Sequence, residues 1–343
     1  MLPSHSVHQS NTVAVEPGPP VMVLGVSRSG TSLLRQILNH HSKLAIPPES
    51  YFIPILWDRY RSHQNVEKLL TDVGFLVRLR QWGVRPEEIR TRLPSCPAFA
   101  DVIQAIYKSY AEARGKARFG DKTPLYMRHL ELLEQVFPTA RYIHIVRDGR
   151  NAALSYFDMP YRPRFSWAWP KGFADFALCW RNEIAGARSF GATVAAGRYC
   201  ELRYEDLVTE PEAKLREVCS FLNLELESAM LEYYRDLRPS GRRLTNHARL
   251  AEPPTPGLRD WRNLMKPADL ERFEAIAGEL LSGLGYARAF ANPSKWARVS
   301  AAASGAVSYG RSLLVSLAMP VLWRSPVWRW RQAYTLRRAG HPF

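Results

Sequence analysis

The sequence predicts an α/β fold of three layers, α/β/α, in which helices cover both faces of a central parallel sheet. Short apolar runs of strand length, above all Val21–Leu24 and Tyr142–Val146, alternate with longer stretches of helical periodicity. Neither run alternates apolar with polar residues, which is typical of strands that are buried on both faces. The 343 residues are enough for one large domain of this kind.

The predicted elements follow one another in a regular order. Apolar residues recur at helical spacing from Leu33 to Leu38, directly after the first strand and its loop. In parallel sheets of this kind, ligands bind beyond the carboxyl ends of the strands. The later elements are expected as a mostly helical insertion at 51–115, a helix at 125–137, the strand at 142–146, helices from 151 and at 173–187, a strand at 199–204, an ordered loop at 238–263, and helices at 211–222 and 267–284.

The loop after the first strand, GVSRSGTS at 25–32, is similar to a nucleotide-binding P-loop. Gly25 and Gly30 hold the glycine positions and Ser32 holds the hydroxyl position, but Thr31 replaces the lysine. Arg28 is the loop's only cation. A glycine loop between a strand and a helix presents backbone N–H groups to an anion. We therefore expect a P-loop-like fold whose nucleotide ends in a group other than a triphosphate.

A second candidate phosphate site follows the strand at 142–146. Arg147 stands at the carboxyl end of this strand, and Ser155 lies eight residues further on. An arginine fork beside a hydroxyl suits a phosphate monoester. The alternative is a structural ion pair between Arg147 and Asp148.

These segments resemble the sulfotransferases that use 3′-phosphoadenylyl sulfate (PAPS). The loop at 25–32 resembles their 5′-phosphosulfate motif, and RYIHIVRDGRNAALS at 141–155 resembles their 3′-phosphate motif. The most similar subgroup contains tyrosylprotein sulfotransferases and many bacterial enzymes, and it has a proline at the position of Ser27. Further matches are FGDKTP at 119–124, LRYEDLVTEPEAKLREVCSFLNL at 202–224 and RDWRNLM at 259–265, so that the resemblance covers roughly 18–290.

The resemblance implies which residues hold the 5′-phosphosulfate. The side chain of Arg28 and the backbone of Ser29, Gly30, Thr31 and Ser32 would bind it.

It also implies residues for the rest of the nucleotide. Arg147 and Ser155 would bind the 3′-phosphate, Tyr204 would lie near the adenosine, and Trp261 and Arg262 would close over the nucleotide. The subgroup's late serine has no counterpart here, and Arg242 or Arg243 are expected in its place.

The resemblance implies three catalytic residues. Lys122 would sit by the oxygen that bridges phosphate and sulfate, and Glu49 falls at the position of the base. Together with Arg28, Lys122 would stabilise the charge that grows on the leaving phosphate. The alternatives are a solvated Lys122, a Glu49 that caps a helix, and His247 as the base.

These residues imply a sulfotransferase that moves the sulfuryl group of PAPS to an acceptor hydroxyl, by in-line displacement and without a metal. The product is adenosine 3′,5′-bisphosphate. The acceptor stays open among carbohydrate, lipid-linked, phenolic and tyrosyl compounds, and its selection is expected from aromatic residues in 51–115 and 156–175. The alternatives in other classes are a P-loop kinase or triphosphatase and a non-catalytic nucleotide-binding protein at a membrane.

Charge and composition describe the two ends of the chain. The formal net charge is +15, and 291–343 holds eight Lys or Arg and no Asp or Glu, together with Trp296, Trp323, Trp328 and Trp330. This composition favours a helix on an anionic membrane surface over nucleic-acid binding; a helix packed on the core or used in a homodimer is the alternative.

The four cysteines form no metal or disulfide pattern, and 1–17 reads as a flexible arm without a secretory signal. A cytoplasmic enzyme, peripheral on a membrane's inner face, is expected.

Overall fold

A five-stranded sheet forms the centre of the molecule in a computed structural model that describes residues 18–61, 65–159, 170–236 and 248–324. The strand order is β2–β3–β1–β4–β5, and every neighbouring pair is parallel. Parallel pairing places the carboxyl ends of all five strands at one edge. The strands are β1 (Val21–Leu24), β2 (Leu44–Ala45), β3 (Arg118–Asp121), β4 (Arg141–Val146) and β5 (Tyr199–Arg203).

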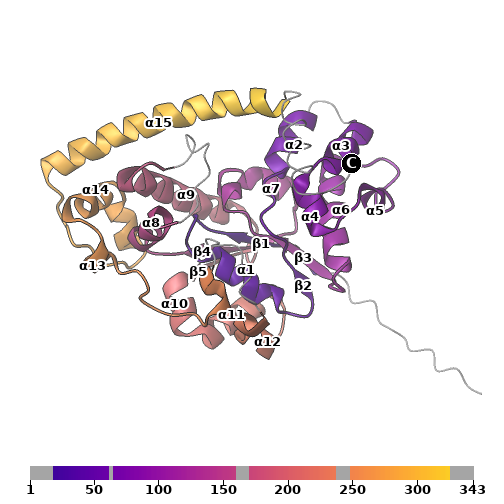
Figure 1. Cartoon of the computed structure of the whole chain (residues 1–343), viewed down its shortest axis with the longest axis horizontal. Helices are drawn as coiled ribbons and strands as arrows, with labels where there is room; N and C mark the ends of the chain where they lie inside the picture. The colour runs from indigo at the N-terminus through magenta and orange to yellow at the C-terminus, as the bar shows by residue number, and fades with distance from the viewer. Residues whose placement is uncertain (1–17, 62–64, 160–169, 237–247, 325–343) are drawn as a thin grey trace, which may run out of the picture.

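Helices cover both faces of the sheet, because successive side chains of a strand point to opposite faces. Val21 and Val23 of β1 join the apolar cluster of α1, α11 and α12, whereas Met22 and Leu24 join the cluster of α2 to α7. Figure 1 shows α10, α11 and α12 below the sheet and α9 above it. The first layer comprises α1 (Thr31–Asn39), α10 (Tyr204–Thr209), α11 (Pro211–Leu222) and α12 (Ser228–Leu231).

The opposite layer holds most of the helices, including those of the predicted insertion at 51–115. They are α2 (Ile53–Tyr60), α3 (Val66–Gly74), α4 (Val77–Trp82), α5 (Pro86–Arg90), α6 (Phe99–Glu112), the 3₁₀ turn η1 (Pro124–Arg128), α7 (Leu130–Val136), α8 (Gly149–Phe157), α9 (Phe173–Thr193), α13 (Trp261–Leu264) and α14 (Pro267–Gly283). Two further 3₁₀ turns are η3 (Tyr233–Asp236) and η4 (Ala248–Ala251).

The predicted α/β/α fold is confirmed, but two strands escape the sequence pattern. β2 has only two residues, and β3 reads RFGD, in which Arg118 and Asp121 are buried charged residues at the two ends. Tyr204 begins α10 instead of ending the last strand. Of the predicted loop at 238–263, residues 238–247 lie outside the described part, as do 1–17, 160–169 and 325–343.

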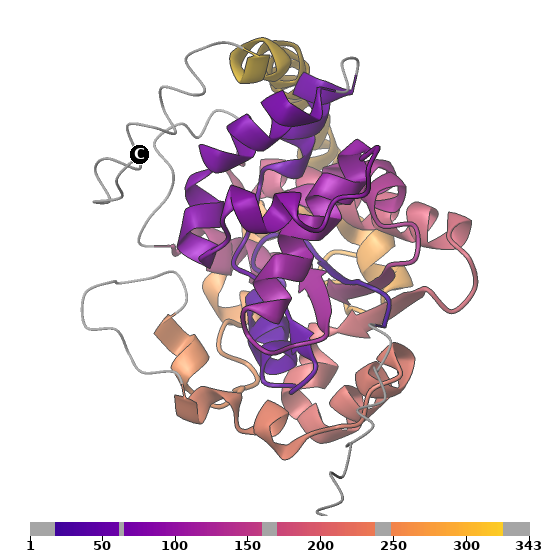
Figure 2. The same ribbon diagram turned by 90° about the vertical axis from the view of Figure 1, so that its right-hand side faces the viewer.

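The basic tail contributes one long helix, α15 (Lys295–Arg324), which contacts α14, α9 and α2. Figures 1 and 2 show it lying along one side of the molecule, remote from α10 and α11. Within the described residues, no helix combines the length and the apolar composition that a bilayer span requires.

Candidate active site

The predicted site residues lie in the order of the strands that carry them. Glu49 follows β2, Lys122 follows β3, the loop 25–32 follows β1, Arg147 follows β4 and Tyr204 follows β5. A short series of contacts joins each to the next along the carboxyl edge of the sheet. Residues that are up to 179 positions apart in the sequence (25 to 204) therefore form one row.

The loop 25–32 takes a backbone shape that other residues at position 30 would not allow. Gly30 has a φ of 93°, and a Cβ atom added there would lie 2.3 Å from Cδ2 of Tyr204. The helix α1 begins directly after Gly30 and has no side-chain cap, so that its first N–H groups keep no internal partner. These N–H groups and the positive end of the helix dipole form an anion site.

We predict that Gly30→Ala destabilises the protein and weakens nucleotide binding, because the new methyl group and the ring of Tyr204 occupy the same space. A loss of about 3 kcal/mol in the free energy of unfolding is expected from strain and overlap together. Gly83→Ala is a matched control, since Gly83 also has a positive φ, 76°, but no atom within 4 Å of an added Cβ. Its loss of unfolding free energy should be about 1 kcal/mol, from the positive φ alone. Denaturant unfolding of both variants checks this, and equal losses would contradict it.

Arg147 lies between the loop and Tyr204. It donates a hydrogen bond to the backbone oxygen of Arg28 at 3.1 Å, and its guanidinium lies 4.4 Å from the ring centroid of Tyr204. Its Nε is buried and has no hydrogen-bond partner among the described residues. Arg28 in turn donates to Oγ of Ser155 at 3.1 Å. Burial lowers the pKa of both Arg147 and Arg28.

Among the described ion pairs, Asp148 pairs with Arg150 and not with Arg147, unlike the predicted alternative. This carboxylate caps α8 and binds Arg150, with Nη2 of Arg150 at 2.7 Å from Oδ2. Arg150 also bonds to Glu274 of α14 at 2.6 Å, so it holds α8 against α14. In VRDGRN, the second arginine is therefore the structural one, and the first faces the site.

Trp261 and Arg262 occupy different environments. The indole of Trp261 is buried, donates to Oδ2 of Asp148 at 3.1 Å and stacks on Arg150 at 3.8 Å. Arg262 is exposed and pairs with Asp260 at 3.2 Å. Trp261 thus supports the segment after Arg147 through Asp148 and Arg150. The positions of His247, Arg242 and Arg243 lie outside the described residues.

Glu49 and Lys122 form the other end of the row. Nζ of Lys122 lies 2.5 Å from Oε1 of Glu49 and 3.1 Å from Oγ of Ser32, at the start of α1. The Lys122 side chain is only 3% exposed, and this burial lowers its pKa, while Glu49 opposes the shift. The hydroxyl of Tyr51 donates to the other carboxylate oxygen of Glu49. Neither the solvated Lys122 nor a Glu49 acting as a helix cap matches this geometry.

A buried hydroxyl cluster holds the segment that carries Glu49. Asp121 accepts hydrogen bonds from Tyr107 at 2.7 Å and from Ser50 at 3.1 Å, and Ser50 also bonds to Tyr126 at 2.5 Å. Burial raises the pKa of Asp121 to about 6, although its hydroxyl donors oppose the shift. The cluster ties Ser50, the neighbour of Glu49, to Asp121, the neighbour of Lys122.

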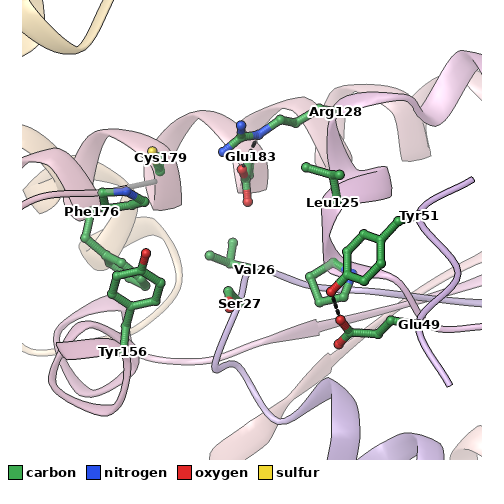
Figure 3. A pocket seen from close by; sticks show the side chains of 12 residues that line it. Val26, Ser27, Glu49, Tyr51, Leu125, Arg128, Tyr156, Phe176, Cys179 and Glu183 are labelled. Atoms are coloured by element: carbon green, nitrogen blue, oxygen red, sulfur yellow. Dashed lines mark hydrogen bonds and ion pairs between the residues drawn. The ribbon is translucent and has the colours of Figure 1, made fainter. Parts of the chain in front are cut away.

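A pocket opens beside Glu49 and the first residues of the loop. Its volume is about 540 Å³ including the open mouth. Figure 3 shows Glu49 and Tyr51 on one side and α9 on the other, where Arg128 pairs with Glu183 at 2.8 Å. Burial raises the pKa of Glu183, while Arg128 opposes the shift. The lining residues are Val26, Ser27, Glu49, Tyr51, Pro124, Leu125, Arg128, Tyr156, Pro170, Phe176, Cys179 and Glu183.

Sequence reasoning missed several of these groups. Tyr51 was expected only as an aromatic residue of the acceptor side, although its position two residues after Glu49 was a usable signal. Arg128 and Glu183 lie on η1 and α9, 55 positions apart, and no motif connects them. Among the described residues, no group of three or more His, Cys, Asp and Glu side chains could hold a metal ion.

Comparison with known proteins identifies the family. The sequence profile described as Sulfotransferase family matches residues 19–228, which is more than half of the chain. The chain belongs to this family. The resemblance predicted from the sequence is therefore confirmed.

Relatives within the family include protein-tyrosine sulfotransferases. The chain is 27% identical over 236 residues to protein-tyrosine sulfotransferase A of Caenorhabditis elegans, which covers 66% of this chain and 57% of that protein. It is 26% identical over 298 residues to protein-tyrosine sulfotransferase 1 of Danio rerio, covering 82% and 75%. The chain thus spans less than two thirds of the length of the C. elegans relative.

A solved structure has the same fold. The sulfotransferase domain of the Synechococcus PCC 7002 olefin synthase superimposes with a TM-score of 0.52 at 24% identity, covering 79% of this chain and 96% of that domain. This likeness supports the α/β/α architecture of the chain.

Proposed function

We propose that this sulfotransferase transfers the sulfuryl group of PAPS to an acceptor hydroxyl, with Glu49 as the base. The observation that carries the proposal is the continuous row from Glu49 through Lys122 and the glycine loop to Arg147. The row thus presents a base, a cation and two anion sites in this order. The reacting groups would follow the same order: the acceptor hydroxyl, the bridging oxygen, the 5′-phosphosulfate and the 3′-phosphate.

The donor side of the row has polar atoms that suit a ligand with a phosphate at each end. Nε of Arg147 and Oγ of Ser29 are both buried without a hydrogen-bond partner among the described residues. Buried polar atoms are normally paired, so these two atoms favour a ligand whose oxygen atoms accept hydrogen bonds from them. Arg28 bridges the two anion sites through Ser155 and the backbone contact with Arg147.

When bound, PAPS supplies the sulfuryl group and leaves as adenosine 3′,5′-bisphosphate. Lys122 contacts both Glu49 and Ser32, so its ammonium is in reach of the phosphosulfate site at the start of α1. A buried, positioned cation stabilises developing negative charge more strongly than one in water. Glu49 accepts the proton of the acceptor hydroxyl, and Tyr51 orients the carboxylate by its hydrogen bond.

The acceptor is a compound with a hydroxyl group that enters the pocket beside Glu49. Tyr156, Phe176 and Leu125 give this pocket an apolar wall, and the Arg128–Glu183 pair gives it one polar region. A phenolic or tyrosyl acceptor fits such a wall, and the tyrosyl class is the one named for the C. elegans and Danio rerio relatives. Carbohydrate and lipid-linked hydroxyls are the other candidates.

Transfer of labelled sulfate from PAPS tests the function directly. A panel of a tyrosine peptide, a simple phenol, a sugar and a lipid-linked sugar is incubated with the protein and labelled PAPS. Label on any of these supports the proposal. Label on none, together with undetectable binding of adenosine 3′,5′-bisphosphate, would contradict it.

Nucleotide selectivity separates this function from that of a P-loop kinase or triphosphatase. Because Thr31 replaces the P-loop lysine while Arg147 offers a second anion site, adenosine 3′,5′-bisphosphate should raise the melting temperature by several degrees at saturation. ATP with magnesium should raise it far less at the same concentration. The reverse order in thermal unfolding would favour the kinase.

A further inference from the structure

The helix α15 is attached to the catalytic part of the molecule by one of its sides. Ala297, Ala301 and Ser308 are buried on this side. Asp175 of α9 accepts hydrogen bonds from Ser308 at 2.6 Å and from Arg311 at 2.5 Å. We call these three side chains the Asp175 clasp. It fixes which side of α15 faces inward.

A different side of α15 carries an apolar stripe that no other described residue covers. Trp296 is 78% exposed, Val307 70% and Leu314 66%. At 100° per residue, these positions lie within about 20° of one another around the helix axis. The complete stripe consists of Trp296, Val299, Val307, Leu314, Leu317 and Val321, with Tyr309 and Leu313 at its margin.

The stripe is unusual for a surface and requires a partner. Exposed large apolar residues are normally scattered, and a continuous patch marks a surface for a protein or a membrane. Most of the large apolar residues that are exposed in the described part of the chain belong to α15. The exceptions are Leu258 and Leu264.

The charge of this part of the chain decides between the partners. Lys295 and Arg298 are exposed beside the stripe, and 291–343 contains eight Lys or Arg without a single Asp or Glu. In a symmetric dimer the same patch meets itself, so two such basic segments would repel each other without acidic partners of their own. An anionic lipid surface offers the opposite charge and an apolar layer at once.

We infer that α15 lies in the surface of an anionic lipid bilayer, with the stripe of Trp296, Val299, Val307, Leu314, Leu317 and Val321 in the lipid. The Asp175 clasp keeps the other side of the helix on α9. This inference does not depend on the proposed reaction, because it concerns a surface outside the row of site residues.

Vesicle flotation with the full chain tests the inference. Wild type should float with vesicles of phosphatidylcholine and phosphatidylserine in equal amounts, and at least about tenfold less with phosphatidylcholine alone. The double variant Leu314→Glu/Leu317→Glu should lower the partition coefficient on the anionic vesicles by at least about tenfold. Ala213→Glu/Ser220→Glu adds the same charge to exposed positions of α11 and should bind like wild type.

Two further measurements show whether lost flotation comes from the stripe itself. Equal melting temperatures of the two double variants exclude unfolding as the cause of lost flotation. An environment-sensitive fluorophore on Val307→Cys should shift to shorter wavelength on anionic vesicles, and one on Ala213→Cys should not. Unchanged flotation of the stripe variant would overturn the inference. So would stripe-dependent self-association in sedimentation without vesicle binding, which would assign the stripe to a dimer.

Discussion

Replacing Glu49 by Gln should lower the rate of sulfuryl transfer by about 10²–10⁴-fold and leave nucleotide binding nearly unchanged. The amide keeps the shape of the side chain and can still accept the hydrogen bond of Lys122, now 2.5 Å from Oε1. It cannot take a proton from the acceptor. Single-turnover transfer from PAPS, with the affinity for adenosine 3′,5′-bisphosphate measured by calorimetry, checks both halves of this expectation.

A matched control separates the base from a general effect of lost charge. Glu112 of α6 pairs with Arg92 on the surface and takes no part in the contacts of the row of site residues. Glu112→Gln should therefore retain full activity. Full activity of Glu49→Gln would remove Glu49 from the mechanism, and loss of nucleotide affinity in the same variant would assign it a role in donor binding instead.

Replacing Arg147 by Met should weaken the binding of adenosine 3′,5′-bisphosphate by about 100-fold, roughly 2.7 kcal/mol. A buried guanidinium with an unpaired Nε supplies charge-assisted hydrogen bonds to the 3′-phosphate. Arg147→Lys should fall between the variant and wild type, because it keeps the charge and loses the fork. Calorimetric titration measures all three proteins.

The ligand itself provides the control for this prediction. Adenosine 5′-phosphosulfate lacks the 3′-phosphate, so wild type and Arg147→Met should bind it with similar affinity. An equal loss for both nucleotides would show that Arg147 shapes the loop through the backbone oxygen of Arg28 and does not read the 3′-phosphate.

The sequence predicts those site residues whose position follows from a single strand and its loop. Gly25 and Arg147 each follow a strand directly, Gly30 lies in the same loop as Gly25, and parallel pairing of β1 with β4 brings the two loops to one edge. Lys122 was found through a motif, although β3 itself did not read as a strand. Local chemistry and one topological rule were sufficient for Gly25, Gly30 and Arg147, whereas Lys122 came from the family resemblance.

The support around the site depends on contacts between distant segments and left no local signal. Asp121, Tyr107 and Tyr126 meet Ser50 from different elements, and only the fold brings these hydroxyl groups together. The sequence analysis also assigned no role to Arg150, the second arginine of VRDGRN. Burial against Glu274 gives Arg150 a structural role, and that contact spans 124 positions.

The helix α15 also limits how the molecule can be oriented. Its 30 residues correspond to a rod of about 45 Å. A rod of this length that lies flat on a plane prevents the molecule from tilting along the helix axis. The Asp175 clasp prevents the rest of the molecule from rotating about that axis. Asp175 directly precedes Phe176 of the pocket. On a bilayer, the pocket would thus keep a constant height and tilt, and acceptors held in the same plane would reach it by a search in two dimensions.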